Sequence, residues 1–271
     1  MADRRERLAA MFSDAADEDR AVLLPYLTAG LPDLETSVDM FVAMADAGAD
    51  GFEVGIPYSD PLMDGPVIHE AGITALKRGA DVTRTFELIR QIVAATGKPV
   101  VAMTYVNPVL RLGPSVFAAK LAEAGACGVI LADLPADESD LFVEAFGAAG
   151  LGVVLFVAPT TDEERLARVV AHDPVFLYGI AELGVTGERE TSSSHAAGLA
   201  ARVRAVSDAP LVLGVGISTP DQAASAAVVA DGVIVGTALV RRVLEAASAE
   251  SAAQALHTAV GELASAVRSA R

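Results

Sequence analysis

The sequence has few of the residues that form disulfides or bind metals. Cys127 is the only cysteine, which excludes an internal disulfide and a metal site built on several cysteines. It precedes an apolar run and is predicted to be a small buried hydrophobe. The four histidines are scattered, with no pair at ligand spacing; they are His69, His172, His195 and His257. We therefore expect no metal site.

Long apolar runs and an excess of positive charge are also absent. No run approaches the roughly 18 to 20 apolar residues that span a membrane. Residues 1–7 carry charges of both signs and lead to no apolar segment, so we expect no signal peptide and a soluble, cytoplasmic protein. The formal net charge of −16 argues against nucleic acids and anionic membranes as partners. An anionic substrate would have to be held by local groups against this charge.

Apolar segments rich in Val, Ile and Leu alternate with alanine-rich helical segments. The predicted strands begin near residues 22, 51, 99, 128, 152, 175, 210 and 232. Eight strand-helix units predict an α/β fold, a closed (β/α)8 TIM barrel, which typically takes about 250 residues; a doubly wound open sheet is the alternative. No linker divides the chain, so residues 1–271 are predicted to form a single domain. An extra N-terminal amphipathic helix is predicted over residues 4–17, with Leu8, Met11 and Phe12 on one face.

The second predicted strand carries an isolated carboxylate. Its apolar residues alternate with Gly51, Glu53 and Gly55, so Glu53 faces away from the apolar side and its glycine neighbours would leave room around it. Glutamate is depleted in strands, and burying an unpaired carboxylate is costly. Glu53 is therefore a candidate functional residue. The alternative is that it simply ends an ordinary strand.

The loop after this strand is stiffened by proline. Pro57, Pro61 and Pro66 each fix φ and restrict the preceding residue. The segment that carries Asp60 and Asp64 therefore has little freedom to lose and can aim a side chain. The alternative is that both aspartates only cap turns.

Two of the predicted strands are followed by unusually long stretches of sequence before the next strand begins. The second and third strands start at 51 and 99, and the sixth and seventh at 175 and 210. We therefore expect long loops at the C-terminal face of the barrel, where the active sites of this fold lie. The second loop, residues 184–194, is polar and glycine-flanked like a mobile lid. A disordered loop would have the same composition.

Glycines at the ends of strands 7 and 8 are candidates for a phosphate site. Residues 214–218 and 232–238 each place glycines before a helical run, where exposed N–H groups and the helix dipole favour an anion. Neither segment contains Lys or Arg, so the backbone would have to bind the phosphate. Other strand ends add polar or aromatic residues near the mouth: Tyr26, Thr28, Tyr105, Asn107, Asp133 and Tyr178. Asp133 is equally explained as a cap.

At these motifs the chain resembles the α subunit family of tryptophan synthase. The matching segments are PYLTAG at residues 25–30, EVGIPYSDPLMDGP at 53–66, GVTG at 184–187 and the glycine ends of strands 7 and 8. The resemblance implies a lyase that cleaves indole-3-glycerol phosphate to indole and glyceraldehyde 3-phosphate, with Glu53 and Asp64 as the catalytic carboxylates. It implies no cofactor in this chain and an α2β2 complex with a β subunit that holds pyridoxal phosphate.

The resemblance also extends to individual binding positions. The residues expected to bind substrate are Tyr26, Tyr105, Tyr178, Thr186, Gly187, Gly216, Gly236 and Thr237, and Pro57 and Asp60 are expected at the β-subunit interface. Val67, His69 and Ala181 depart from the family's usual residues, which leaves the carboxylates untouched.

Two rival functions are open at this point. One is another phosphate-binding barrel, such as indole-glycerol-phosphate synthase, but that chemistry needs a lysine at a strand end, and Lys77, Lys98 and Lys120 lie elsewhere. The other is a non-catalytic phosphate-binding subunit that activates a partner enzyme. Turnover by the isolated chain would distinguish this second rival from the enzyme.

Overall fold

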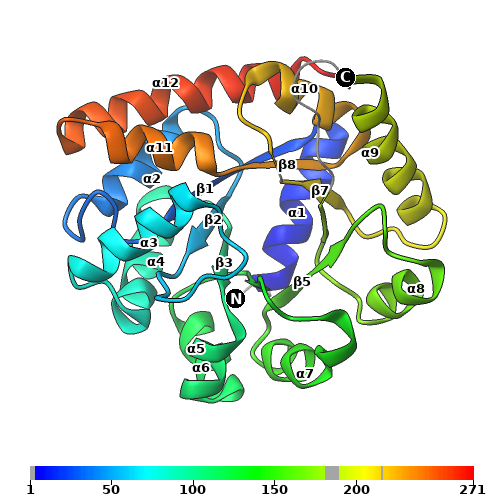
Figure 1. Ribbon diagram of the computed structural model, residues 1–271, viewed down its shortest axis with the longest axis horizontal. Coiled ribbons are helices and arrows are strands. Elements are labelled where there is room, and N and C mark those ends of the chain that lie inside the picture. Colours follow the sequence, from blue (N-terminus) through cyan, green and yellow to red (C-terminus); the bar gives the residue numbers. More distant parts are fainter. Residues whose placement is uncertain (1–3, 181–188, 215) are drawn as a thin grey trace.

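Eight parallel strands close into a barrel (Figure 1), in a computed structural model that describes residues 4–180, 189–214 and 216–271. Each strand pairs in parallel with the next strand along the chain, and β8 closes the ring by pairing with β1. This confirms the predicted (β/α)8 TIM barrel and rules out the open sheet. The strands are β1 (Val22–Thr28), β2 (Phe52–Gly55), β3 (Val100–Thr104), β4 (Gly128–Leu131), β5 (Gly152–Val157), β6 (Leu177–Gly179), β7 (Leu211–Leu213) and β8 (Gly232–Val235).

Helices surround the ring of strands (Figure 1). They are α1 (Arg4–Asp17), α2 (Ser37–Asp46), α3 (Pro66–Lys77), α4 (Val82–Thr96), α5 (Val106–Leu112), α6 (Pro114–Glu123), the 3-10 helix η1 (Ala136–Glu138), α7 (Asp140–Ala148), α8 (Glu163–Ala171), α9 (Arg189–Arg204), α10 (Pro220–Val229), α11 (Thr237–Glu245) and α12 (Ala249–Arg268). Along the described chain, no helix is both long and apolar enough to cross a membrane.

Two expected loops contain more helix than the sequence pattern indicated. The extra chain after β2 forms the additional helix α3, which begins at Pro66, a residue whose fixed φ suits the first helical turn. The predicted polar loop through residue 194 is also wrong in part, since α9 already begins at Arg189. Only residues 56–65 therefore remain as the loop between β2 and α3.

Alternation along β2 sends its side chains to two different layers. Phe52 packs against Phe41 of α2, with ring centroids 5.3 Å apart, so it faces the helices. Glu53 points the other way, into the barrel, because successive strand residues face opposite sides. The parallel register pairs Glu53 with Tyr26 of β1, which places both side chains in the interior.

The N-terminal helix closes the end of the barrel at which the strands begin. Figure 1 shows α1 lying across the middle of the ring of strands, and Leu8, Met11 and Phe12 are buried there, as the sequence predicted. A Cβ at Gly51 would lie 3.0 Å from the Met11 sulfur, and one at Gly128 would lie 3.3 Å from a Leu8 methyl. Glycine in these strands therefore makes room for the helix that plugs the barrel.

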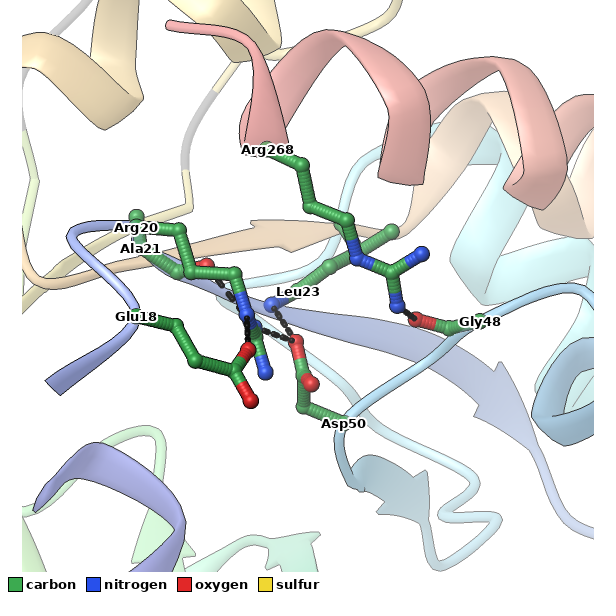
Figure 2. A network of polar contacts seen from close by, with 7 residues as sticks. All are labelled: Glu18, Arg20, Ala21, Leu23, Gly48, Asp50 and Arg268. Atoms are coloured by element: carbon green, nitrogen blue, oxygen red, sulfur yellow. Dashed lines mark hydrogen bonds and ion pairs between the residues drawn. The ribbon is translucent and has the colours of Figure 1, made fainter. Parts of the chain in front are cut away.

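A charged network fastens the same end (Figure 2). Asp50 precedes β2 and accepts hydrogen bonds from the Leu23 N–H at 2.8 Å and from Arg20 at 3.0 Å. The side chains of Arg20 and Asp50 are only 14% and 11% exposed. Arg268 of α12 donates to the Gly48 carbonyl at 3.2 Å, beside the same turn. The network joins the entrances of β1 and β2 to the C-terminal helix.

Asp50→Ala is expected to lower the free energy of unfolding by about 1–3 kcal/mol, because it leaves the Leu23 N–H without its acceptor and leaves Arg20 with only the exposed Glu18 as an ion-pair partner among the described residues. Urea unfolding followed by circular dichroism measures this. Asp46→Ala, at an exposed position of α2, is the matched control and should change the value by less than about 0.5 kcal/mol. Equal stabilities of the two variants would contradict the role given to the network.

Candidate active site

A cavity of about 210 Å³ opens at the carboxyl ends of the strands and contains both predicted carboxylates. Glu53 comes from β2 and Asp64 from the loop between β2 and α3, so the barrel brings them together from different elements. The described residues that line the cavity are Tyr26, Glu53, Met63, Asp64, Gly65, Ile68, Met103, Tyr178, Gly214, Gly216, Ile217, Ser218, Ile234, Gly236 and Thr237. None of these is a lysine or an arginine.

Glu53 is a buried acid. It is 5% exposed, and within the described chain its Oε2 atom has no hydrogen-bond partner. Burial, together with the nearby charge of Asp64, raises its pKa from 4.5 to about 8. At neutral pH the Glu53 carboxyl is therefore mostly protonated and can give a proton to a substrate.

Asp64 has a different environment from Glu53. Burial raises the pKa of Asp64, while a hydrogen bond with Tyr105 and the charge of His69 act in the opposite direction. Asp64 is half-buried and Glu53 fully so. Two neighbouring carboxyl groups with different surroundings are able to take different roles, one protonated and one ionised.

Two tyrosines fill the space beside the carboxylates. The Tyr26 hydroxyl hydrogen-bonds Thr28 at 3.2 Å, and a Cβ at Gly55 would lie 2.2 Å from that hydroxyl oxygen. A Cβ at Gly214 would lie 2.0 Å from the Tyr178 hydroxyl oxygen. The expectation of open room around Glu53 is therefore wrong on the Gly55 side, because the space that the glycine leaves is occupied by Tyr26.

An anion site is available at the start of α11. Gly236 caps this nine-residue helix and Thr237 begins it, both at the cavity. The first N–H groups of a helix have no partner within it and point outward. At α10, by contrast, the N–H groups of Ser218 and Thr219 already donate to the Gln222 side chain, at 2.8 and 3.2 Å. Within the described chain the start of α11 has no such side-chain cap, so its backbone N–H groups are available to an anion in the cavity.

The structure brings most of the predicted site residues to this cavity. Tyr26, Tyr178, Gly216, Gly236 and Thr237 line it together with the two carboxylates. Gly216 has φ +79° and open space where a Cβ would be, as a close approach of a ligand to the backbone requires.

Other predicted residues lie elsewhere. Tyr105 is buried but is not among the residues that line the cavity; its hydroxyl contacts the loop that carries Asp64. Pro57 is buried, whereas Asp60 is exposed. Thr186 and Gly187 fall outside the described residues. Asp133 caps a helix, since it accepts from the Val106 N–H of α5 at 2.8 Å.

Several lining residues were missed by the sequence analysis. They are Met63, Gly65, Ile68 and Met103; Gly214, Ile217, Ser218 and Ile234 belong to the two glycine segments that were predicted as a phosphate site. The sequence held a signal for one of them, Met103. It pairs with Gly55, which lies on the same inward face of the sheet as Glu53. Alternation along β3 could therefore have identified Met103 as an inward-facing residue. Ile68 lies on α3, which was not predicted, and nothing in its local sequence places it at the mouth.

The comparisons with known proteins agree on one family. Residues 12–268 match the family described as tryptophan synthase alpha chain. The chain belongs to this family. It is 45% identical to the tryptophan synthase alpha chain of Salinispora tropica, covering 97% of this chain and 98% of the relative. A tryptophan synthase structure from Mycobacterium tuberculosis superposes with a TM-score of 0.87 at 42% identity, covering 97% of this chain and 98% of that one. A subunit alpha structure from Legionella pneumophila gives 0.88 at 34% identity, with 96% and 98% covered.

Tryptophan synthase alpha chains cleave indole-3-glycerol phosphate, and this chain is a lyase of tryptophan biosynthesis. Membership in this family favours the lyase over the two alternative functions, another phosphate-binding barrel and a non-catalytic subunit. Over the described ranges no group of three or more His, Cys, Asp or Glu residues could hold a metal ion.

The buried acid predicts a pH dependence of stability. Glu53 has a pKa of about 8 in the folded chain and 4.5 when unfolded, so the folded state retains a proton that the unfolded state releases. Its contribution to stability is complete below about pH 4.5 and is lost as the pH rises towards 8. Urea unfolding of wild type and Glu53→Gln between pH 5 and 9 tests this. Wild type should lose stability relative to Glu53→Gln as pH rises, and parallel curves would refute the buried, protonated acid.

Proposed function

We propose that Glu53 and Asp64 are the catalytic pair that cleaves indole-3-glycerol phosphate in this chain. The observation that carries the proposal is that a buried acid with a pKa of about 8, a second carboxylate and a free helix N-terminus all face one cavity. A substrate with an aromatic ring at one end and a phosphate at the other can contact all three at once.

Glu53 is the general acid and base of this mechanism. Its protonated carboxyl gives a proton to carbon 3 of the indole ring, which turns the ring into a cationic indolenine. The carboxylate left on Glu53 then takes the proton from the hydroxyl on the adjacent side-chain carbon. As that hydroxyl becomes a carbonyl, the carbon–carbon bond breaks and its electrons return to the ring. The products are indole and glyceraldehyde 3-phosphate.

Asp64 stabilises the intermediate. In its ionised form it accepts a hydrogen bond from the indole N–H, where positive charge develops on protonation at carbon 3. The Tyr105 hydrogen bond and the His69 charge both favour this ionised form against the effect of burial. A negative charge placed beside the cation lowers the energy of the step that forms it.

The remaining cavity residues hold the substrate. Tyr178 and Tyr26, which line the cavity, contact the indole ring. The phosphate contacts the N-terminus of α11 at Gly236 and Thr237, with Gly216 opposite, so that backbone dipoles rather than a lysine bind the dianion. Thr186 and Gly187, which lie outside the described residues, remain predicted substrate-binding residues by the family resemblance. The chain itself uses no cofactor.

Glu53→Gln and Asp64→Asn are each expected to lower kcat for indole release by on the order of 10² to 10⁴, because each removes a group that acts on the reacting ring. Indole formation from indole-3-glycerol phosphate, followed by absorbance, measures this. Glu70→Gln, an exposed change on α3, is the matched control and should retain wild-type kcat. A Glu53→Gln enzyme with wild-type kcat would refute the assignment of the acid.

The catalytic loop also carries an apolar surface. Leu62 and Met63 are 81% and 62% exposed, and Leu110 of α5 is 52% exposed. The loop and the start of α5 are neighbours in space, joined by the Asn107–Tyr58 hydrogen bond, and exposed apolar side chains on neighbouring elements are typical of a protein interface. We propose that a β subunit, which holds pyridoxal phosphate, binds this surface in an α2β2 complex in the cytoplasm. In that complex residues 1–271 act as a single domain.

Asp60 is the proposed charged contact with that subunit. It is exposed in the same loop, four positions before Asp64, and is therefore free to meet a basic group of the partner. Pro57 is buried in the isolated chain, so it contributes by shaping the loop. Partner binding at Asp60 is thereby tied to the position of Asp64.

Addition of the β subunit should accelerate cleavage, and Asp60→Ala should remove most of that acceleration while the slow turnover of the isolated chain persists. Titration of β subunit into a fixed amount of each variant, with indole release as the readout, measures both quantities. Asp17→Ala, an exposed aspartate on α1 at the opposite end of the barrel, serves as the control. Full activation of Asp60→Ala would show that the partner acts through other residues.

A further inference from the structure

The loop that carries Asp64 has few bonds of its own. Within residues 56–65 the backbone hydrogen bonds given by the structure include Leu62 N–H to the Asp60 carbonyl at 3.0 Å and Asp64 N–H to the Pro61 carbonyl at 3.1 Å. The neighbouring Leu62 and Met63 are largely exposed. Prolines limit the conformations of such a loop but do not fix where it lies. Contacts with other elements must therefore hold Asp64 at the cavity.

Tyr105 supplies the first of these contacts. It follows β3, precedes α5 and is 2% exposed. Its hydroxyl accepts from the Met63 N–H at 3.3 Å, and its interaction with the Asp64 carboxyl lowers the pKa of Asp64 against the effect of burial. A buried ring thus presents its polar end to two successive residues of the loop. The position of Asp64 then depends on the position of the Tyr105 ring.

Tyr58 and Asn107 support that ring from the outer side. The rings of Tyr58 and Tyr105 lie 5.2 Å apart, tilted by 32°. The Asn107 side-chain amide donates to the Tyr58 hydroxyl at 2.8 Å. Tyr58 lies near the beginning of the β2–α3 loop, and Asn107 lies in the first turn of α5. This hydrogen bond therefore joins the loop to the helix.

The helix that carries Asn107 is itself anchored. The Val106 N–H at the start of α5 donates to Asp133, which follows β4, at 2.8 Å. The carboxylate satisfies a helix N–H and complements the positive end of the helix dipole. A series of contacts therefore runs from the β4 end through α5 to Tyr58, and from Tyr58 through Tyr105 to Asp64.

We propose that Tyr58 and Asn107 are positioning residues for cleavage, which act by holding the Tyr105 ring and the Asp64 loop in place. Neither lines the cavity, so neither touches the substrate. The inference rests on the proposed role of Asp64. It assigns a function to one hydroxyl and one amide that no step of the chemistry uses.

The experiment is a double-mutant cycle on the isolated full-length chain. Tyr58→Phe keeps the ring against Tyr105 and removes only the hydroxyl, Asn107→Ala removes the donor, and the third variant combines both. Each single change should lower kcat about 3- to 10-fold, the size expected for one hydrogen bond that positions a reacting group. The KM for indole-3-glycerol phosphate should change less than about two-fold, because the phosphate and ring contacts remain. The double variant should match the singles, since both remove the same bond.

Thr258→Ala is the matched control. It removes an exposed side-chain hydrogen bond of similar length, 3.0 Å to the Gln254 carbonyl, on α12 on the far side of the barrel from α5 (Figure 1). It should leave kcat at the wild-type value. Thermal unfolding of all variants, compared with this control, separates a loss of position from a general loss of stability.

The outcomes distinguish this inference from the site assignment. Wild-type kcat in Tyr58→Phe, or additive losses in the double variant, would overturn the positioning role. If Asp64→Asn also keeps wild-type kcat, the site assignment itself has failed. If Asp64→Asn is inactive while Tyr58→Phe is unchanged, only the inference about Tyr58 and Asn107 has failed.

Discussion

The burial of the Glu53 carboxyl is the constraint on which the site depends. A carboxyl group in the barrel interior stays protonated only while no cation lies close to it, because a nearby positive charge would lower its pKa. No lysine or arginine is among the described residues that line the cavity. In the proposed site the substrate's phosphate would therefore be held without a cationic side chain from this lining. The dipole of α11 carries only part of a charge, so it can hold a dianion with less effect on Glu53.

The far end of the barrel serves the same constraint. Gly51 lies two residues before Glu53 on the inward side of its strand, and Met11 of α1 fills the space that this glycine leaves. Tyr26 fills the corresponding space on the other side of Glu53, at Gly55. Glycine before and at the end of β2 is needed for this packing, because a side chain at either position would displace the methionine or the tyrosine.

Much of this could be predicted from the sequence, because the signals are local. Strand periodicity located the barrel, and a single glutamate in an apolar strand indicated Glu53. The contacts that depend on distant residues could not be predicted: Asn107 and Tyr58 are 49 positions apart and meet only because β2 and β3 are neighbours. The start of helix α3 at Pro66 was not located, because the stretch after the second strand was counted as one long loop around Asp60 and Asp64. Tyr105 was placed at the right end of β3, but its packing against Tyr58, a residue of another loop, could not be read from the local sequence.

One loop joins the chemistry to the surface. Asp64 follows Leu62 and Met63, which are among the most exposed apolar residues of the described chain. A partner that covers those two side chains, as proposed, would also shield the Met63 N–H and its hydrogen bond to the Tyr105 hydroxyl from water. Hydrogen bonds strengthen as the local dielectric falls, so such a partner would hold the loop beside Asp64 more firmly. The same exclusion of water strengthens the interaction between an ionised Asp64 and a cationic ring. In the proposed complex, partner binding and catalysis would therefore be coupled by solvation of one ten-residue segment, residues 56–65, as well as by any charge that the partner brings.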